Sequence, residues 1–243
     1  MIQQLVVNGC SYMESYSQGG GHVDLARRLG FVGKFNIPQA ATLAIGGSAN
    51  NRILRTTLKH AASNPSPTLY ILGMTFVSRT EIPILIDQDQ FEGRWTNPQN
   101  QYFRDKWVPH WTDTDHMNYM DLMLKWEKHS LLDRTEDLMY RMISAKHMLL
   151  NLGHRVLMFQ QADSSYWMWL QDTRLRLLDS CPEIMHGFSW ASVRWQHQQG
   201  VAPTDYKNPE VKVPPEITHP APGHHQLLNQ YLTNYIQEHK ILQ

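Results

Sequence analysis

Short apolar runs alternate along this chain with longer segments whose apolar residues recur at helical spacing. Each run ends at glycine or polar residues, which is typical of a strand buried on both faces of a parallel sheet. The expected strands are 5–7, 40–45, 68–72 and 155–160, with a weaker fifth at 183–186. The expected helices are 22–29, 49–62, 134–152 and 223–241. Alternation at this spacing predicts a doubly wound α/β sheet covered by helices.

The helix at 134–152 has the clearest end signals. Asp133 is placed to cap its first turn, and Glu136 follows three residues later, as in a capping box. Gly153 comes directly after the periodic pattern and is expected to end the helix. We therefore predict a helix that begins directly after Asp133.

Two regions interrupt the alternation. Residues 86–132 are rich in Trp, Asp, Asn and Pro, and residues 187–215 have the composition of a loop. Connections longer than about 15 residues are usually lids, binding loops or disordered segments. A chain of 243 residues commonly forms one α/β domain. We therefore expect a single domain over 1–243, with an insertion or cap at about 86–132.

The charges of the chain are balanced. Lys and Arg together number 22, as do Asp and Glu, which gives no reason to expect nucleic acid or an anionic membrane as a partner. The first residues lack the basic region of a signal peptide, and no stretch approaches the ~20 apolar residues of a membrane span. Two cysteines are too few for a disulfide scaffold. We expect a soluble cytoplasmic protein, and the sequence does not indicate its oligomeric state.

The segment 8–12, Asn-Gly-Cys-Ser-Tyr, directly follows the first expected strand. In an open parallel sheet, ligands bind beyond the carboxyl ends of the strands, so Ser11 is presented at the mouth of a site. Gly9 permits the tight turn that directs this serine outward. A serine that only caps a helix is the alternative. Cys10 is a competing nucleophile, although adjacent residues face different sides of an extended segment, and a buried structural thiol is the preferred interpretation.

A second motif, Glu216-Ile217-Thr218-His219-Pro220, precedes the last expected helix. Pro220 disfavours the α conformation at His219 and holds it in a turn. A carboxylate three residues earlier can fold back onto the imidazole, which is the role of the acid in a Ser-His-acid triad. A surface histidine beside a surface glutamate is the alternative interpretation.

In the order of these motifs the chain resembles the SGNH (GDSL-like) hydrolases. The family's Gly-Asp-Ser block is matched by Gly9-Cys10-Ser11, with Cys in the Asp position. Its glycine after the second strand is matched by Gly47, and its final Asp-x-x-His-Pro block by the segment 216–220, with Glu for Asp. The resemblance implies a three-layer, flavodoxin-like hydrolase with Ser11 as nucleophile, His219 as base and Glu216 as orienting acid.

The third family block, Gly-x-Asn-Asp, is where the sequence departs from the pattern. The chain has Gly73-Met74-Thr75-Phe76, so Thr75 stands where the family has the Asn that donates to the oxyanion. Losing one oxyanion donor typically lowers the rate about 10²–10³-fold. We expect the backbone N–H groups of Ser11 and Gly47 to hold the oxyanion with the Thr75 hydroxyl. Asn50 or Asn51 could replace the missing amide.

Other candidate sites carry weaker signals. Tyr12 and Arg79 are placed to contact substrate, although an ion pair of Arg79 with Glu81 that orders the loop is the simpler interpretation. The histidine pairs at 110 and 116 and at 224 and 225 lack a convincing third ligand, so no metal is expected. No phosphate-binding glycine loop is present, and no cofactor is expected.

These observations predict a serine esterase or deacylase that acts on a small acyl ester. Aromatic content and family analogy extend the prediction to esters of carbohydrates. The alternative is a binding protein that has kept the hydrolase fold without its activity. Thr75 in place of Asn and the long region 86–132 favour this alternative.

Overall fold

The computed structural model describes most of the elements predicted from the sequence. The described residues are 1–10, 13, 34–45, 48–75, 81–87, 90–95, 112–160, 172–189 and 222–243. The expected helix at 22–29 lies outside them.

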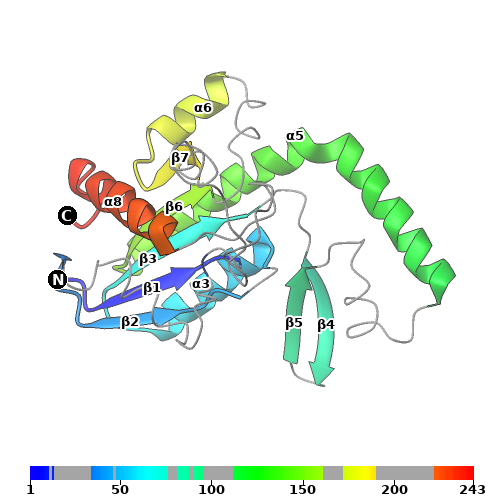
Figure 1. Ribbon diagram of the computed structural model, residues 1–243, viewed down its shortest axis with the longest axis horizontal. Coiled ribbons are helices and arrows are strands. Elements are labelled where there is room, and N and C mark those ends of the chain that lie inside the picture. Colours follow the sequence, from blue (N-terminus) through cyan, green and yellow to red (C-terminus); the bar gives the residue numbers. More distant parts are fainter. Residues whose placement is uncertain are drawn as a thin grey trace.

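The centre of the fold is a five-stranded sheet in the order β2-β1-β3-β6-β7, in which every neighbouring pair is parallel (Figure 1). The strands are β1 (Gln4–Asn8), β2 (Gln39–Thr42), β3 (Thr68–Met74), β6 (Arg155–Gln160) and β7 (Ile184–Ser189). All seven residues of β3 are buried, as expected for a central parallel strand that is covered on both faces. The predicted α/β fold is thereby confirmed, although β2 ends earlier than expected.

Alternate strand residues pack into two separate cores, one on each face of the sheet. On one face, β-strand side chains pack with helices α3 (Asn50–Ser63) and α5 (Asp113–Asn151). On the other face they pack with α8 (Pro222–Glu238). The first core includes Val6, Tyr70, Leu72, Met158, Ile53 and Met139, and the second includes Val7, Ile71, Leu157, Phe159, Leu228 and Leu232. Because successive side chains of a strand point to opposite faces of the sheet, each strand contributes residues to both cores.

Helix α5 is longer than the sequence predicts. The expected start after Asp133 is wrong, because the helix runs without interruption from residue 113. No Gly or Pro occurs between residues 113 and 132 to end it. Its first turn is instead capped by Thr112, which forms a capping box with Asp115. The predicted end is confirmed, since Gly153 follows the helix with a φ of 82°.

The region expected to be an insertion contains regular structure. Strands β4 (Glu81–Asp87) and β5 (Gln90–Trp95) form a separate antiparallel pair. In Figure 1 this hairpin stands beside the main sheet, and the first half of α5 extends away from the sheet. A cap over 86–132 stays a prediction.

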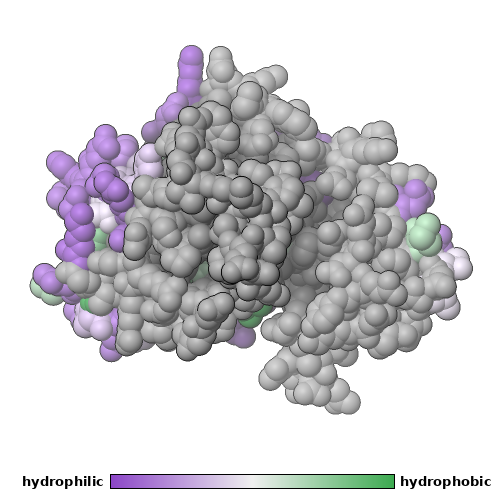
Figure 2. All heavy atoms as spheres, in the orientation of Figure 1, coloured by the Kyte–Doolittle hydropathy of each residue, from purple (hydrophilic) through white to green (hydrophobic). Residues whose placement is uncertain are grey.

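The remaining short helix, α6 (Asp172–Asp179), precedes β7. Hydrophilic side chains gather at the end of the molecule where both termini lie (Figure 2), and residues 237–240 there are exposed. None of the helices in the described ranges has both the length and the apolar character needed to cross a membrane.

Candidate functional site

Four buried polar residues lie at the carboxyl ends of the central strands and at the start of α3. Asn8 ends β1, Thr75 directly follows β3, Gln160 ends β6, and Asn50 begins α3. Their exposed fractions are 0%, 1%, 2% and 6%. We call these four residues the carboxyl-edge cluster. It lies beside the point where the connections from β1 and β3 leave the sheet, which is where open α/β sheets bind ligands.

Asn8 ties the end of β1 to α3. Its Nδ2 group lies 2.9 Å from the carbonyl oxygen of Ile53 and 3.0 and 2.8 Å from the hydroxyl oxygens of Thr56 and Thr57. Its Oδ1 accepts a hydrogen bond of 2.8 Å from the N–H of Gly9. The side chain therefore fixes the backbone at the start of the segment that leads to Ser11.

The loop between β2 and α3 is attached to the same place. The N–H of Leu43 donates to Val7 O at 2.8 Å, and the N–H of Ile45 donates to Gly9 O at 3.3 Å. Gly9 belongs to the segment 8–12 that contains Ser11, and Ile45 lies two residues before Gly47. The structure therefore brings together the backbone that leads to Ser11 and the backbone that leads to Gly47.

The far side of this loop is held by a buried arginine. Ser48 donates from its hydroxyl to Ile45 O at 2.6 Å, and Arg52 Nη1 donates to the Ser48 hydroxyl at 3.0 Å. Arg52 is only 7% exposed although it carries a charge. Its hydrogen bonds therefore fix the loop that precedes α3 from within the protein.

Asn50 and Gln160 both bind the backbone of Thr75. The Thr75 N–H donates to Asn50 Oδ1 at 2.7 Å, and Asn50 Nδ2 donates to Thr75 O at 3.1 Å. Gln160 Nε2 donates to the same carbonyl at 3.0 Å. Thr75 is thus held by its main chain, and its side chain is not used to secure it.

Two side-chain atoms of the cluster lack a hydrogen-bond partner in the part of the chain that the structure describes. They are Thr75 Oγ1 and Gln160 Oε1, and both are buried; the residues that the structure describes supply no group to bind either of them. Buried polar atoms are rarely left unpaired in proteins, which sets these two atoms apart from the other polar side-chain atoms of the cluster.

The predicted oxyanion donors have different positions in this network. Among the described residues the Thr75 hydroxyl has no hydrogen-bond partner, and its role as an oxyanion donor stays a prediction. Both polar atoms of the Asn50 side chain bind Thr75, and Asn51 is exposed and accepts a hydrogen bond of 3.2 Å from Arg141. The role of Asn50 as an oxyanion donor stays a prediction.

Several predicted site residues lie outside the described residues. They are Ser11, Tyr12, Gly47, Arg79, Glu216 and His219. Their neighbour Cys10 is described: it is 1% exposed, and its carbonyl accepts a hydrogen bond of 2.9 Å from the Met13 N–H. The expectation that Cys10 is buried is confirmed, and a thiol in this position is closed to substrate in solvent.

The sequence did not assign a role to Asn8 or Gln160. Each is the last residue of its strand and follows a run of at least three apolar residues. A polar residue at the carboxyl end of a buried parallel strand is the signal that could have identified them.

A second polar cluster lies at the opposite edge of the sheet. His60 Nδ1 lies 2.8 Å from the hydroxyl of Tyr70, and burial, with a smaller contribution from His154, lowers the pKa of His60. Burial raises the pKa of Tyr70 to about 12. His154 Nδ1 accepts from the Thr68 N–H at 3.3 Å, so its Nε2 carries the hydrogen that faces Ala61 O at 3.3 Å. These bonds join the end of α3 to the start of β3 and to the chain before β6.

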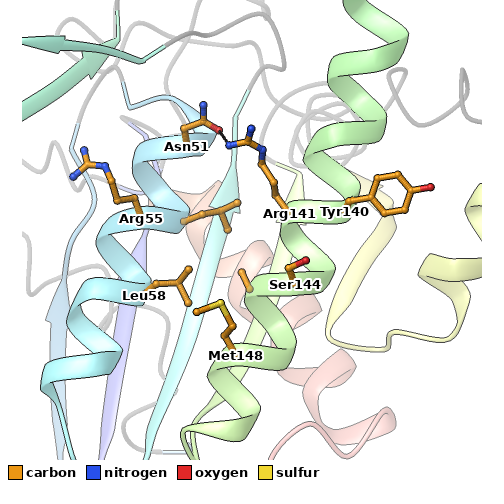
Figure 3. Close-up of a pocket in the computed structure, with 9 residues that line it drawn as sticks. Asn51, Arg55, Leu58, Tyr140, Arg141, Ser144 and Met148 are labelled. Atoms are coloured by element: carbon orange, nitrogen blue, oxygen red, sulfur yellow. Dashed lines mark hydrogen bonds between the residues drawn. The ribbon is translucent and has the colours of Figure 1, made fainter.

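An apolar groove of about 460 Å³ separates α3 from α5. Leu58 and Met148 point toward one another across it, whereas Arg55 and Tyr140 point away (Figure 3). A hydrogen bond between Arg141 and Asn51 crosses one end. The groove is lined mainly by hydrocarbon, with Ser144 and Arg141 among its polar residues.

Compared with known proteins, the sequence matches no protein-family model and no curated protein. Within the described part of the chain, no three His, Cys, Asp or Glu side chains come together as metal ligands would.

Proposed function

We propose that this protein is a serine hydrolase of the SGNH type that cleaves small acyl esters. The observation that carries the proposal is the hydrogen bond between the Ile45 N–H and Gly9 O, because it joins the Gly9-Cys10-Ser11 block to a residue two positions before Gly47 and 36 residues further along the chain. The strand order supports the same proposal, since it is the order of flavodoxin-like doubly wound sheets.

The proposed chemistry follows the residues assigned from the sequence. His219, oriented by Glu216, takes the proton of Ser11, whose Oγ attacks the carbonyl carbon of the ester. The backbone N–H groups of Ser11 and Gly47 and the Thr75 hydroxyl hold the oxyanion. The alcohol leaves with the proton from His219. A water molecule, deprotonated by His219, then releases the acid from Ser11.

The carboxyl-edge cluster gives this proposal a physical basis. Thr75 is held through its backbone by Asn50 and Gln160, so its hydroxyl is free to donate without any loss of packing. A donor that is fixed before the reaction stabilises the developing charge without reorganisation. Tyr12 and Arg79 would contact the substrate beside this donor.

A binding protein without hydrolytic activity is the second candidate. The observation that favours it is Thr75, which stands where the family's amide donor is expected. A protein that binds the ligand without stabilising the oxyanion would have the carboxyl-edge cluster but would not hydrolyse the ester.

The test is the Ser11→Ala variant, assayed with p-nitrophenyl acetate and with a fluorophosphonate that labels activated serines. We expect the substitution to abolish both turnover and labelling. Ser63→Ala, an exposed serine at the far end of α3, is the matched control and should keep both. Equal turnover by the Ser11→Ala variant and the unaltered protein would exclude the mechanism, and no labelling of the folded unaltered protein would favour the binding protein.

A further inference from the structure

A lysine, a cysteine and a glutamate come together just beneath the surface, beside β7. Lys146 Nζ lies 3.4 Å from Cys181 Sγ and 3.5 Å from Glu183 Oε2. Lys146 belongs to α5, whereas Cys181 and Glu183 lie in the connection between α6 and β7. The Lys146 side chain is 7% exposed and Cys181 is 5% exposed. An amine, a thiol and a carboxylate are therefore held together, and none of them has a part in the proposed hydrolase.

The hydrogen bonds at this place determine how the sulfur faces the amine. The Ser180 hydroxyl donates to Leu177 O at 2.8 Å, so it accepts in its 3.8 Å contact with Cys181 Sγ. The thiol hydrogen therefore points to Ser180, and Lys146 donates to a lone pair of the sulfur. Glu183 Oε2 is buried and has no hydrogen-bond partner among the described residues. The amine and the sulfur thus face each other directly, with a carboxylate oxygen beside the amine.

The position of Cys181 gives small oxidants a way to reach it. Ser180 before it is exposed, and residues 182 and 183 after it are half-buried. The strand that follows, β7, is an outer strand of the sheet. Local openings at such an edge admit molecules as small as hydrogen peroxide. Peroxide converts a cysteine thiol into a sulfenic acid, which can condense with a nearby nitrogen atom.

We propose that oxidation by a peroxide joins Lys146 Nζ and Cys181 Sγ through a reversible S–N bond. In the first step the sulfur attacks one oxygen atom of hydrogen peroxide. The O–O bond breaks, an S–OH group forms, and the thiol hydrogen leaves with the other oxygen as water. The sulfur is oxidised and the peroxide is reduced.

In the second step Glu183 Oε2 takes a proton from the Lys146 ammonium, and the neutral amine attacks the sulfenic sulfur. The S–N bond forms as the S–O bond breaks, and the hydroxyl leaves as water with one hydrogen of the amine. Because Nζ already lies 3.4 Å from Sγ, the lysine reaches the sulfur before a thiol from solution does. The link ties α5 to the connection before β7. A dithiol breaks it by forming its own disulfide and returns the amine and the thiol.

The experiment treats the whole protein with hydrogen peroxide, digests it with trypsin without reductant, and analyses the peptides by mass spectrometry. We expect a linked species that joins the peptides containing Lys146 and Cys181 and is lighter than their sum by two hydrogen atoms. Dithiothreitol should convert it back to the separate peptides. Lys59→Arg, at an exposed lysine of α3, is the matched control and should form the same link.

Three variants test the assigned groups. Lys146→Arg keeps a cation beside Glu183, but its guanidinium stays protonated and does not attack the sulfur, so the link should be lost. Cys181→Ser should lose the link as well. Glu183→Gln should form it at least about tenfold more slowly, because the amine loses the carboxylate that takes its proton.

The unaltered protein alone can overturn the proposal, whether or not the variants fold. Capture of oxidised Cys181 by dimedone without any linked peptide would do so, as would a disulfide between the Cys181 residues of two chains. A linked species heavier by one oxygen atom would overturn the S–N bond. Equally fast linking by Glu183→Gln and the unaltered protein would overturn the role of Glu183.

Discussion

The side chain of Asn50 pairs with the backbone of Thr75 as a neighbouring strand would, with one hydrogen bond in each direction. The Thr75 N–H donates at 2.7 Å and the Thr75 carbonyl accepts at 3.1 Å. Residue 75 lies directly beyond the last residue of β3, where the ladder to β6 ends. Asn50 thereby extends the pairing of the strand by one residue and holds the start of α3 against the carboxyl edge.

This pairing predicts the effect of removing the Asn50 amide. Asn50→Leu leaves the buried Thr75 N–H without an acceptor, so we expect the free energy of unfolding to fall by about 1–3 kcal/mol. Asn51→Leu is the matched control at an exposed position and should change it by less than about 0.5 kcal/mol. Urea denaturation of both variants measures the difference. Equal effects at the two positions would show that the pairing contributes nothing.

The His60–Tyr70 pair predicts how stability depends on pH. The pKa of His60 in the folded protein lies below its ordinary value of 6.5, chiefly because of burial. As the pH falls through this value, the unfolded chain takes up the proton first, so the free energy of unfolding decreases. The stability that the protein has with neutral His60 is therefore fully present above pH 6.5 and is lost as the pH falls below 6.5.

The measurement is the free energy of unfolding between pH 7.5 and pH 5.5, chosen to span roughly one pH unit on each side of the ordinary histidine pKa. His60→Gln removes the titrating group, so its stability should decrease less steeply with acid than that of the unaltered protein. His239→Gln replaces an exposed histidine and serves as the control. A steeper acid loss in His60→Gln would contradict the assigned direction of the pKa shift.

A buried lysine provides a further prediction. Lys146 Nζ lies 3.4 Å from Cys181 Sγ and 3.5 Å from Glu183 Oε2, and the Lys146 side chain is 7% exposed. Glu183→Gln removes the only carboxylate assigned to this amine within the described residues, so we expect a loss of about 1–3 kcal/mol. Adding Lys146→Met removes the buried charge and should restore part of the loss. A double-mutant cycle checks this, and purely additive effects would contradict a coupled pair.

The sequence by itself determined the five-stranded sheet and the helices α3 and α8, because these depend on local periodicity. The run 155–160 corresponds residue for residue to β6, and Gly153 ends α5 as predicted. The start of α5 was not predictable in this way. Asp133 is a good capping residue, but the 20 residues before it contain no Gly or Pro, and a cap does not interrupt a helix that already continues past it.

Several residues of the candidate site were likewise predicted from the sequence, whereas their contacts were not. Sequence motifs singled out Thr75 and Asn50 and the segments around Ser11, Gly47 and His219, but they gave no partner for any of these side chains. Only the tertiary structure decided that Asn50 binds the Thr75 backbone and that Gln160, 85 residues further along the chain, binds the same carbonyl. The physical reason is that strand register and helix position set these distances. Contacts between residues far apart in sequence follow from the packing of whole elements, which no local pattern specifies.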